Sequence, residues 1–85
     1  MPTKKITARQ AYGVLRDIYN QPRLVGVLLE LDTTPKARTA AKKDARAYLI
    51  DKGIKLPEDA TVHFSSNKWK LTICFFVFCI SFEHS

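Results

Sequence analysis

The stretch DKGIKLPEDATVHF, residues 51–64, separates a helical part of the chain from a part with the alternation typical of β-strands. A charged helix tail runs into Gly53, which suits the left-handed position after a helix, and Ile54 can then pack back on Leu49. From Thr61 onward, apolar and polar residues alternate with a period of two. The sequence therefore predicts helices before this stretch and antiparallel strands after it, an α+β fold.

Two or three helices are expected in the first part of the chain. The capping-box pattern Thr7-Ala8-Arg9-Gln10 opens the first. Its core face is predicted from apolar residues at helical spacing: Ala8, Ala11, Tyr12, Leu15, Ile18 and Tyr19. A short second helix is predicted over residues 23–31, with a strand as the alternative because Gly26 weakens a helix. A third begins at Thr33-Thr34-Pro35 and ends at Gly53. Its predicted inward stripe comprises Ala37, Ala41, Ala45 and either Tyr48 or Leu49.

A β-hairpin is expected after these helices. Its turn is predicted at Ser65-Ser66-Asn67-Lys68, followed by one continuous return strand. The face predicted to pack on the helices comprises Val62, Phe64, Trp69 and Leu71. From Ile73 to Ile80 both faces of the return strand are apolar, so the pattern predicts that something beyond the helices covers it.

The length of 85 residues allows one small domain, with residues 1–59 helical and 60–85 forming the hairpin and tail. The net charge of +6 fits either simple solubility or attraction to an acidic partner. A basic stripe of Arg38, Lys42 and Arg46 on the third helix could follow phosphates. No aromatic residue interrupts this stripe, so we interpret it as a solvated helix face and expect no binding to nucleic acid.

The two cysteines, Cys74 and Cys79, indicate the redox environment. Met1-Pro2-Thr3-Lys4-Lys5 does not open a signal peptide, so a cytoplasmic location is expected. Residues five apart on one strand point to opposite faces, so a disulfide between them would need a bend. We therefore predict buried free thiols. The apolar run from Leu71 to Phe82 falls short of the roughly 20 residues that span a membrane, and we predict no transmembrane helix.

Catalytic motifs are not found in the sequence. His63 and His84 lie far apart in the chain, and the spacing of the two cysteines is not that of a zinc site. A cysteine in a phenylalanine-rich run is the opposite of an activated thiolate. We therefore predict a protein that is not an enzyme and has no metal or cofactor.

Residues 44–59, DARAYLIDKGIKLPED, followed by TVHF, resemble the pattern of nitrile hydratase alpha-subunit-like leader peptides, which belong to natural-product precursors. In that family a helix ends in a Gly-Ile or Gly-Val step, followed by Leu-Pro with an acid and a short strand. The upstream Pro35-Lys36-Ala37-Arg38 fits the family's helical region, and the resemblance covers roughly residues 35–64. The three-cysteine metal motif of the hydratase subunit and the double-glycine cleavage site of the leaders are absent, so hydratase activity is not implied.

The resemblance implies a ribosomal natural-product precursor whose helical part is recognised by a maturation enzyme. The leader-recognition candidates are then Tyr48, Leu49, Ile54, Leu56 and Pro57. The tail would be the substrate, because hydroxyls can be dehydrated or cyclised and thiols can attack. The modification candidates are Thr72, Cys74, Cys79 and Ser81, with Ser65 and Ser66 beside them.

The alternative is a small folded protein-interaction module that self-associates through its apolar C-terminal strand. Residues 73–80 carry no charge and no proline, so they would form a template for strand pairing at a sheet edge. This hypothesis predicts a homodimer with Phe76 and Phe78 in the interface, which Phe76→Lys would dissociate.

Overall fold

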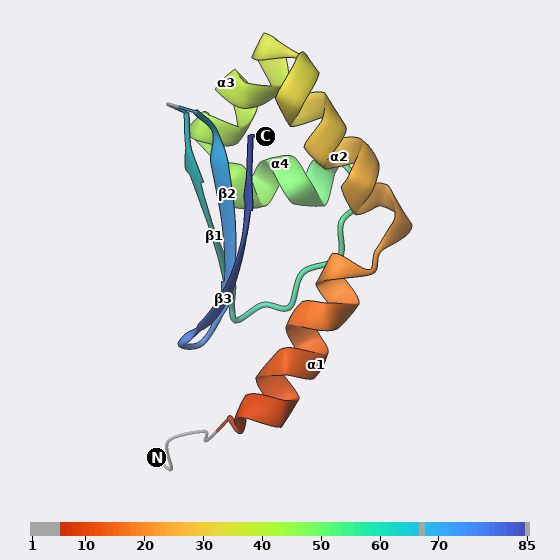
Figure 1. The fold of residues 1–85 in the computed structure, drawn as a ribbon, viewed down its shortest axis with the longest axis vertical. Helices are drawn as coiled ribbons and strands as arrows, with labels where there is room; N and C mark the ends of the chain where they lie inside the picture. Colours follow the sequence, from red (N-terminus) through yellow and green to blue (C-terminus); the bar gives the residue numbers. More distant parts are fainter. Residues whose placement is uncertain (1–5, 67, 85) are drawn as a thin grey trace.

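A computed structural model describes residues 6–66 and 68–84 of the chain. Met1–Lys5 and Asn67, which the sequence assigns to the N-terminal segment and the hairpin turn, lie outside the described residues. The helices come first and the strands last, which confirms the predicted α+β class (Figure 1). In chain order the elements are α1 (Ala8–Tyr19), α2 (Pro22–Thr33), α3 (Pro35–Lys43), α4 (Ala45–Asp51), β1 (Ala60–Ser65), β2 (Lys70–Phe75) and β3 (Phe78–Glu83).

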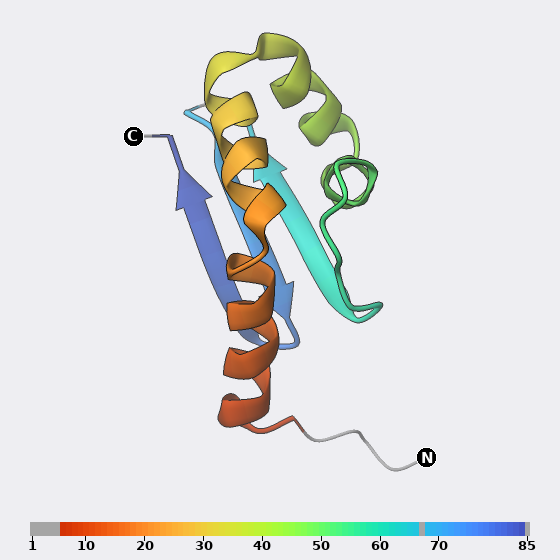
Figure 2. The same cartoon turned by 90° about the vertical axis from the view of Figure 1, so that its right-hand side faces the viewer.

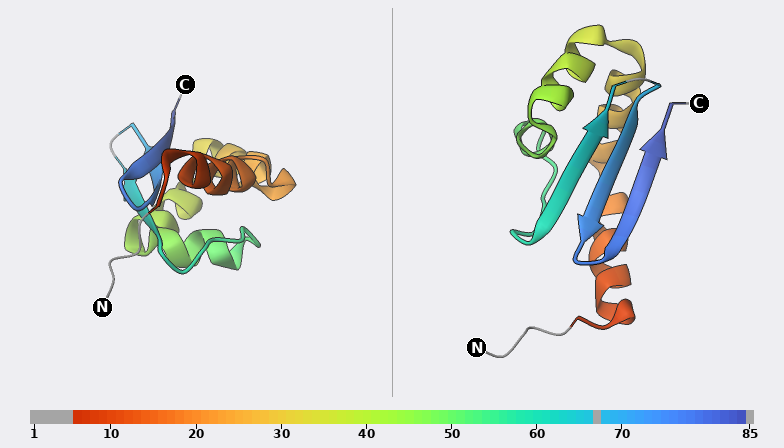
Figure 3. Two further views of the ribbon diagram at one scale, coloured as in Figure 1. Left: turned by 90° about the horizontal axis from the view of Figure 1, so that it is seen from below. Right: turned by 90° about the vertical axis from the view of Figure 1, so that its left-hand side faces the viewer.

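The elements form two layers. The strands make one antiparallel sheet in the order β1-β2-β3. Helices α1 and α2 lie across one face of the sheet, while α3 and α4 lie toward its β1 side (Figure 2). The other face of the sheet carries no helix (Figure 3, right). Strand β3 is therefore an edge strand on the side of the sheet away from α3 and α4.

Helix α1 begins with the capping box that the sequence predicts. The Gln10 backbone N–H donates to the Thr7 hydroxyl oxygen over 3.2 Å, and the Thr7 backbone N–H donates to Gln10 Oε1 over 3.0 Å. The buried stripe of this helix comprises Ala11, Leu15 and Ile18. Three residues predicted for the core are instead exposed: Ala8 in the first turn, and Tyr12 (66%) and Tyr19 (60%), which flank the stripe on its β3 side.

Residues 22–33 form a helix, so the strand alternative for this segment is excluded. Leu24, Val27 and Leu31 are its buried residues. Val25 is 71% exposed and Leu29 is 62% exposed, on the flank of this helix.

The predicted third helix is two helices, because Asp44 interrupts it. Asp44 has extended backbone angles (φ −159°, ψ 94°), ends α3 and caps α4, where its carboxylate accepts the Ala47 N–H over 3.0 Å. An aspartate at an N-cap satisfies an otherwise unpaired N–H, which favours a new helix start. All five residues of the predicted inward stripe are buried, including both Tyr48 and Leu49.

The end of α4 has the predicted left-handed glycine. Gly53 has a φ of +87°, and its N–H donates to the Ile50 carbonyl over 3.0 Å. The Ile54 N–H donates to the Leu49 carbonyl over 3.0 Å, and both of these side chains are buried. These two bonds complete the Schellman ending expected from the sequence.

The predicted single return strand is two strands, because the chain turns at Phe76 and Val77. Phe76 adopts a φ of +58°, which is uncommon for a bulky residue and reverses the chain direction in two residues. The predicted core face of the sheet is confirmed. Trp69 and Leu71 are buried, and Val62 and Phe64 are half-buried against the same core.

The same turn explains why the prediction of free thiols was wrong. It places Cys74 on β2 directly opposite Cys79 on β3, and the two form a disulfide. The bend that a disulfide needs is therefore present. The apolar run 73–80 also no longer exposes two faces of one strand, since Ile73, Phe75, Phe78 and Ile80 all face the helices.

Candidate functional site

The outer edge of β3 presents backbone groups at alternate positions along the strand. The Cα atoms of Cys74 and Cys79 are 4.0 Å apart, the close spacing of a pair that exchanges no backbone hydrogen bonds. In an antiparallel ladder such pairs alternate with bonded ones, so the N–H and C=O groups of Cys79, Ser81 and Glu83 point away from β2. His84 follows Glu83, so the alternation requires its backbone to bond to the neighbouring segment. Its N–H does donate to the Trp69 carbonyl, over 3.0 Å.

These outward groups of β3 have no partner within the described part of the chain. Among the hydrogen bonds of residues 6–66 and 68–84, none joins the backbone of Cys79, Ser81 or Glu83 to a segment on the outer side of β3. Figures 2 and 3 show β3 as the outermost element on its side of the molecule. The edge is therefore free to accept another strand.

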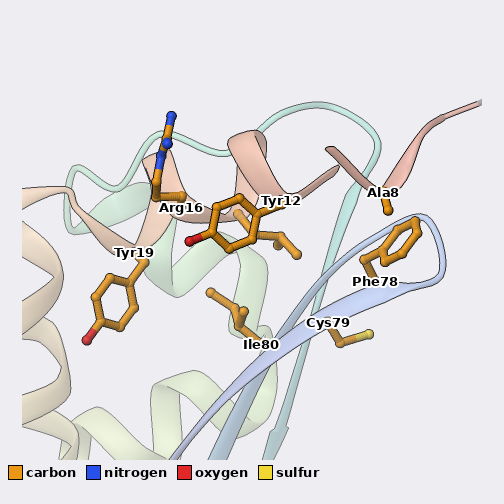
Figure 4. A pocket seen from close by; sticks show the side chains of 8 residues that line it. Ala8, Tyr12, Arg16, Tyr19, Phe78, Cys79 and Ile80 are labelled. Carbon is orange, nitrogen blue, oxygen red and sulfur yellow. The ribbon is translucent and has the colours of Figure 1, made fainter. Parts of the chain in front are cut away.

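An apolar groove of about 390 Å³ lies between α1 and β3. Tyr12 and Tyr19 form its helical wall, and Phe78 and Ile80 form its strand wall (Figure 4). Arg16 supplies the one charged side chain of the lining. The groove runs beside the outward backbone of β3, so it could take apolar side chains of a segment paired with that strand.

A second groove, of about 320 Å³, lies between α2 and the far end of β3. Its apolar wall comprises Val25, Leu28, Leu29 and Phe82. Tyr19 of the first groove stacks on Phe82 of the second, with ring centroids 5.9 Å apart, so the two grooves adjoin. We call the outward backbone of β3 together with these two grooves the β3 surface.

The β3 surface lacks the usual protection of an exposed edge. Natural edge strands are commonly blunted by lysine, proline or a covering segment. Residues 78–83 contain no lysine, arginine or proline, and Glu83 is their one charged residue. Four large apolar side chains that are at least 60% exposed flank this strand: Tyr12, Tyr19, Val25 and Leu29. This combination is typical of a surface that pairs with another chain.

Asp32 is the centre of a polar cluster at the end of β3. Its carboxylate accepts the Trp69 indole N–H over 3.2 Å and also bonds to Nδ1 of His84. The His84 bond and then the Trp69 bond hold the pKa of Asp32 below its usual range. Ser66 lines the same 210 Å³ hollow, but no hydrogen bond among the described residues joins it to His84. The cluster therefore ties β3 to α2 and assembles no nucleophile.

A second polar cluster joins α2 to α4. Lys52 Nζ lies 2.8 Å from Glu30 Oε1, and the Tyr48 hydroxyl donates to the same carboxylate over 3.2 Å. The Lys52 bond lowers the pKa of Glu30, while burial raises the pKa of Tyr48 to about 12. Each group is satisfied by its neighbours, so the cluster holds two helices together.

The leader-recognition candidates lie in the core rather than on a common surface. Tyr48, Leu49 and Ile54 are buried, and Leu56 and Pro57 are half-buried. Two basic residues of the predicted stripe also have structural partners. Arg38 donates to the Leu31 carbonyl over 2.8 Å, and Arg46 donates to the Pro57 carbonyl over 3.0 Å.

The modification candidates do come together, on the sheet face without helices. The hydroxyls of Thr72 and Ser81 lie 3.1 Å apart across β2 and β3, next to the Cys74–Cys79 disulfide. The two predicted self-association residues are separated instead. Phe76 lies in the turn with its ring edge-on to Phe75, while Phe78 lines the first groove.

The sequence did not indicate the helical walls of the β3 surface. Tyr12 and Tyr19 fit the apolar period of α1, so their exposure depends on how the helix is rotated on the sheet. Val25 lies beside the Leu24, Leu28 and Leu31 spacing, but so does Val27, which is buried, so this spacing did not identify the exposed side. Ile80 and Phe82 were recognised as apolar but not as part of a separate edge strand.

Comparison of the chain with family models, with curated proteins and with solved structures finds no match. Within residues 6–66 and 68–84, no helix is long and apolar enough to cross a membrane. The same residues contain no group of three or more His, Cys, Asp or Glu side chains that could hold a metal ion.

Proposed function

We propose that this chain is a small protein-interaction module that binds an extended segment along β3. The observation that carries the proposal is the coincidence of an unpaired strand edge with two apolar grooves beside it. Either feature alone would be ordinary, because edges and scattered exposed apolar residues occur in many domains. Together they match the requirements of strand addition.

Strand addition uses the two parts of the β3 surface differently. The outward backbone of Cys79, Ser81 and Glu83 exchanges hydrogen bonds with the incoming backbone, which supplies affinity without regard to sequence. Alternate side chains of the incoming strand point toward the helix layer and enter the grooves. The intervening side chains lie on the open sheet face beside Ser81. We therefore expect a preference for segments that alternate apolar and polar residues.

A precursor role stays a prediction, and the geometry favours it less. A maturation enzyme would have to reach Leu49 and Ile54, which are at most 2% exposed. It would also have to act on Thr72 and Ser81 while they are bonded to each other in the sheet. Both steps require the folded domain to open, whereas strand addition uses the surface as it stands.

Selection from a library of displayed random peptides tests the proposal without a known partner. We expect enriched peptides with alternating β-branched or aromatic residues. Ser81→Pro removes an outward N–H and the exposed Thr72–Ser81 hydroxyl bond but no backbone bond within the sheet, so the domain should fold and bind these peptides about tenfold more weakly. Ser81→Ala keeps the N–H and is the matched control, with affinity expected within about twofold.

Two results would contradict the proposal. One is a library that yields no strand-like sequences. The other is a folded Ser81→Pro variant, verified by circular dichroism, that binds selected peptides as tightly as the unmodified chain.

A further inference from the structure

We infer that the segment bound along β3 is β3 of a second copy of this chain, related by a two-fold axis at Ser81. This inference rests on the proposed function and names its partner. It follows from the register of the outward groups, from the pairing of side chains that this register produces, and from the position of the exposed helical residues.

The outward groups of β3 are self-complementary. Cys79, Ser81 and Glu83 lie at even spacing, with Ser81 in the centre. Antiparallel pairing about that centre places Ser81 opposite Ser81 of the second copy. It also places Cys79 opposite Glu83 of the second copy and, by symmetry, Glu83 opposite Cys79 of the second copy. Each of these pairs can exchange two backbone hydrogen bonds, so every outward group of the edge finds a partner.

The same register pairs apolar side chains on the helix side of the sheet. Ile80 lies opposite Phe82 of the second copy, and by symmetry Phe82 lies opposite Ile80 of the second copy. These are positions without backbone bonds, where facing Cα atoms are about 4.5 Å apart and side chains are closest. Pairs of aromatic and β-branched residues are among the favourable cross-strand combinations.

The exposed helical residues also become complementary under this axis. Helix α1 borders β3 at its Phe78 and Ile80 end, and α2 borders it at its Phe82 and Glu83 end. The two-fold rotation exchanges the ends of the strand, so α1 of one copy faces α2 of the other. Tyr12 then faces Leu29 of the second copy, and Tyr19 faces Val25 of the second copy.

No like charges oppose each other in the paired strands. Glu83, the one charged residue of β3, faces Cys79 of the second copy and keeps Lys70 as its partner at 3.6 Å. On the open sheet face, the Thr72 and Ser81 hydroxyls of both copies form one continuous row. Such a row can exchange hydrogen bonds across the seam.

Because the net charge is +6, self-association and binding of an acidic partner should depend on salt in opposite ways. Two copies of the same cationic chain repel each other, and salt screens that repulsion. Self-association should therefore strengthen with ionic strength. An acidic partner would bind most tightly at low salt and weaken as salt is added.

Sedimentation equilibrium of the full chain at micromolar concentration, at low and high salt, tests the inference. We expect a dimer whose dissociation constant falls as salt is added. Leu29→Lys places a charge against Tyr12 of the second copy and should raise that constant at least about tenfold. Ile50→Lys is the matched control, because Ile50 is 49% exposed on α4 and lines neither groove. It adds the same charge and should leave the dimer unchanged.

A rescue variant tests the predicted pairing directly. Tyr12→Glu combined with Leu29→Lys should restore association that Leu29→Lys alone removes, since the two new charges face each other across the seam. A dimer that weakens with salt, or one that Leu29→Lys and Ile50→Lys affect equally, overturns the inference. A monomer at every salt concentration that still binds selected peptides overturns it too, and leaves the proposed function intact.

Discussion

The two edges of this three-stranded sheet differ in their contacts with the helices. At the β1 edge, Arg46 of α4 donates to the Ala60 carbonyl over 2.5 Å and to the Pro57 carbonyl over 3.0 Å. At the β3 edge, the outward groups of Ser81 and its neighbours meet no such side chain among the described residues. Helix α4 and its guanidinium therefore cover the Ala60 end of the β1 edge, and no such contact is made at β3 within the described part of the chain.

The exposed apolar surface of the helices also differs between the two sides of the sheet. Four of the large exposed apolar side chains, on α1 and α2, border β3. On α4, which packs beside β1, Ile50 is the exposed large apolar residue. Exposure that is concentrated at the open edge is more informative than exposure spread over the surface.

The largest expected effect comes from the central strand β2, which pairs with both edge strands. Leu71 on β2 has no exposed surface, so Leu71→Ala should lower the free energy of unfolding by about 2–5 kcal/mol. Urea denaturation measures the change. Thr61→Ala, at an exposed position on β1, is the control and should stay within about 0.5 kcal/mol. An equal loss in both variants would contradict the assignment of Leu71 to the core.

Reduction of the disulfide should loosen the open edge selectively. The Cys74–Cys79 bond closes a short loop, and its loss should cost about 2 kcal/mol of stability. We expect faster amide exchange in β3 than in β1 after a dithiol is added, because the disulfide joins β3 to β2, whereas β1 is also held by Arg46 at Ala60 and Pro57. The Cys74→Ser, Cys79→Ser double variant should not respond to the dithiol. Equal acceleration in both strands would show that the edges are not independent.

Loss of the Arg46 contacts at the β1 edge should have a smaller cost. Arg46→Met keeps the side-chain stem but leaves the Ala60 carbonyl unpaired and the Pro57 carbonyl with the Ala60 N–H alone, which should cost about 1–2 kcal/mol. Lys42→Met removes a charge from the same predicted stripe at an exposed position and should change little. Thermal denaturation of the two variants compares them, and similar shifts would contradict the structural role of Arg46.

Acid should produce the smallest effect. The pKa values of Asp32 and Glu30 are lowered in the fold, so the unfolded chain binds more protons and stability falls as pH drops through the range below about 4.5. Asp32→Asn should flatten this dependence, and unfolding curves between neutral and acid pH measure it. Asp17→Asn, at an exposed pair with Arg16, should leave the dependence unchanged. If stability still fell with pH in the Asp32→Asn, Glu30→Gln double variant, other groups would be responsible for the pH dependence.

Local signals were sufficient to predict much of the fold. The Thr7 capping box, the Pro35 start and the Gly53 ending each depend on a few adjacent residues, and all three form as predicted. The break at Asp44 was missed because the alanine spacing continues through it, although aspartate is a strong N-cap. At Asp44 the local preference for an N-cap outweighs the helical spacing of the alanines.

The features that define the candidate site depend on tertiary structure. The turn at Phe76 and Val77 contains no glycine, proline or asparagine, and strand pairing holds Phe76 at a positive φ that its own preference disfavours. Without that turn the sequence could not reveal the third strand, the disulfide or the open edge. The exposure of Tyr12 and Val25 depends on how two helices rest on that sheet.

The contact between α1 and the last two strands has a consequence for the order of folding. The stripe of Ala11, Leu15 and Ile18, close to the start of the chain, packs on β2 and β3 near its other end. A helix of this length is marginal by itself in water, so α1 gains its full stability after residues 70–83 have been synthesised and paired. Contacts this distant in sequence slow folding. Pairing of β2 with β3 therefore precedes, or coincides with, the docking of α1.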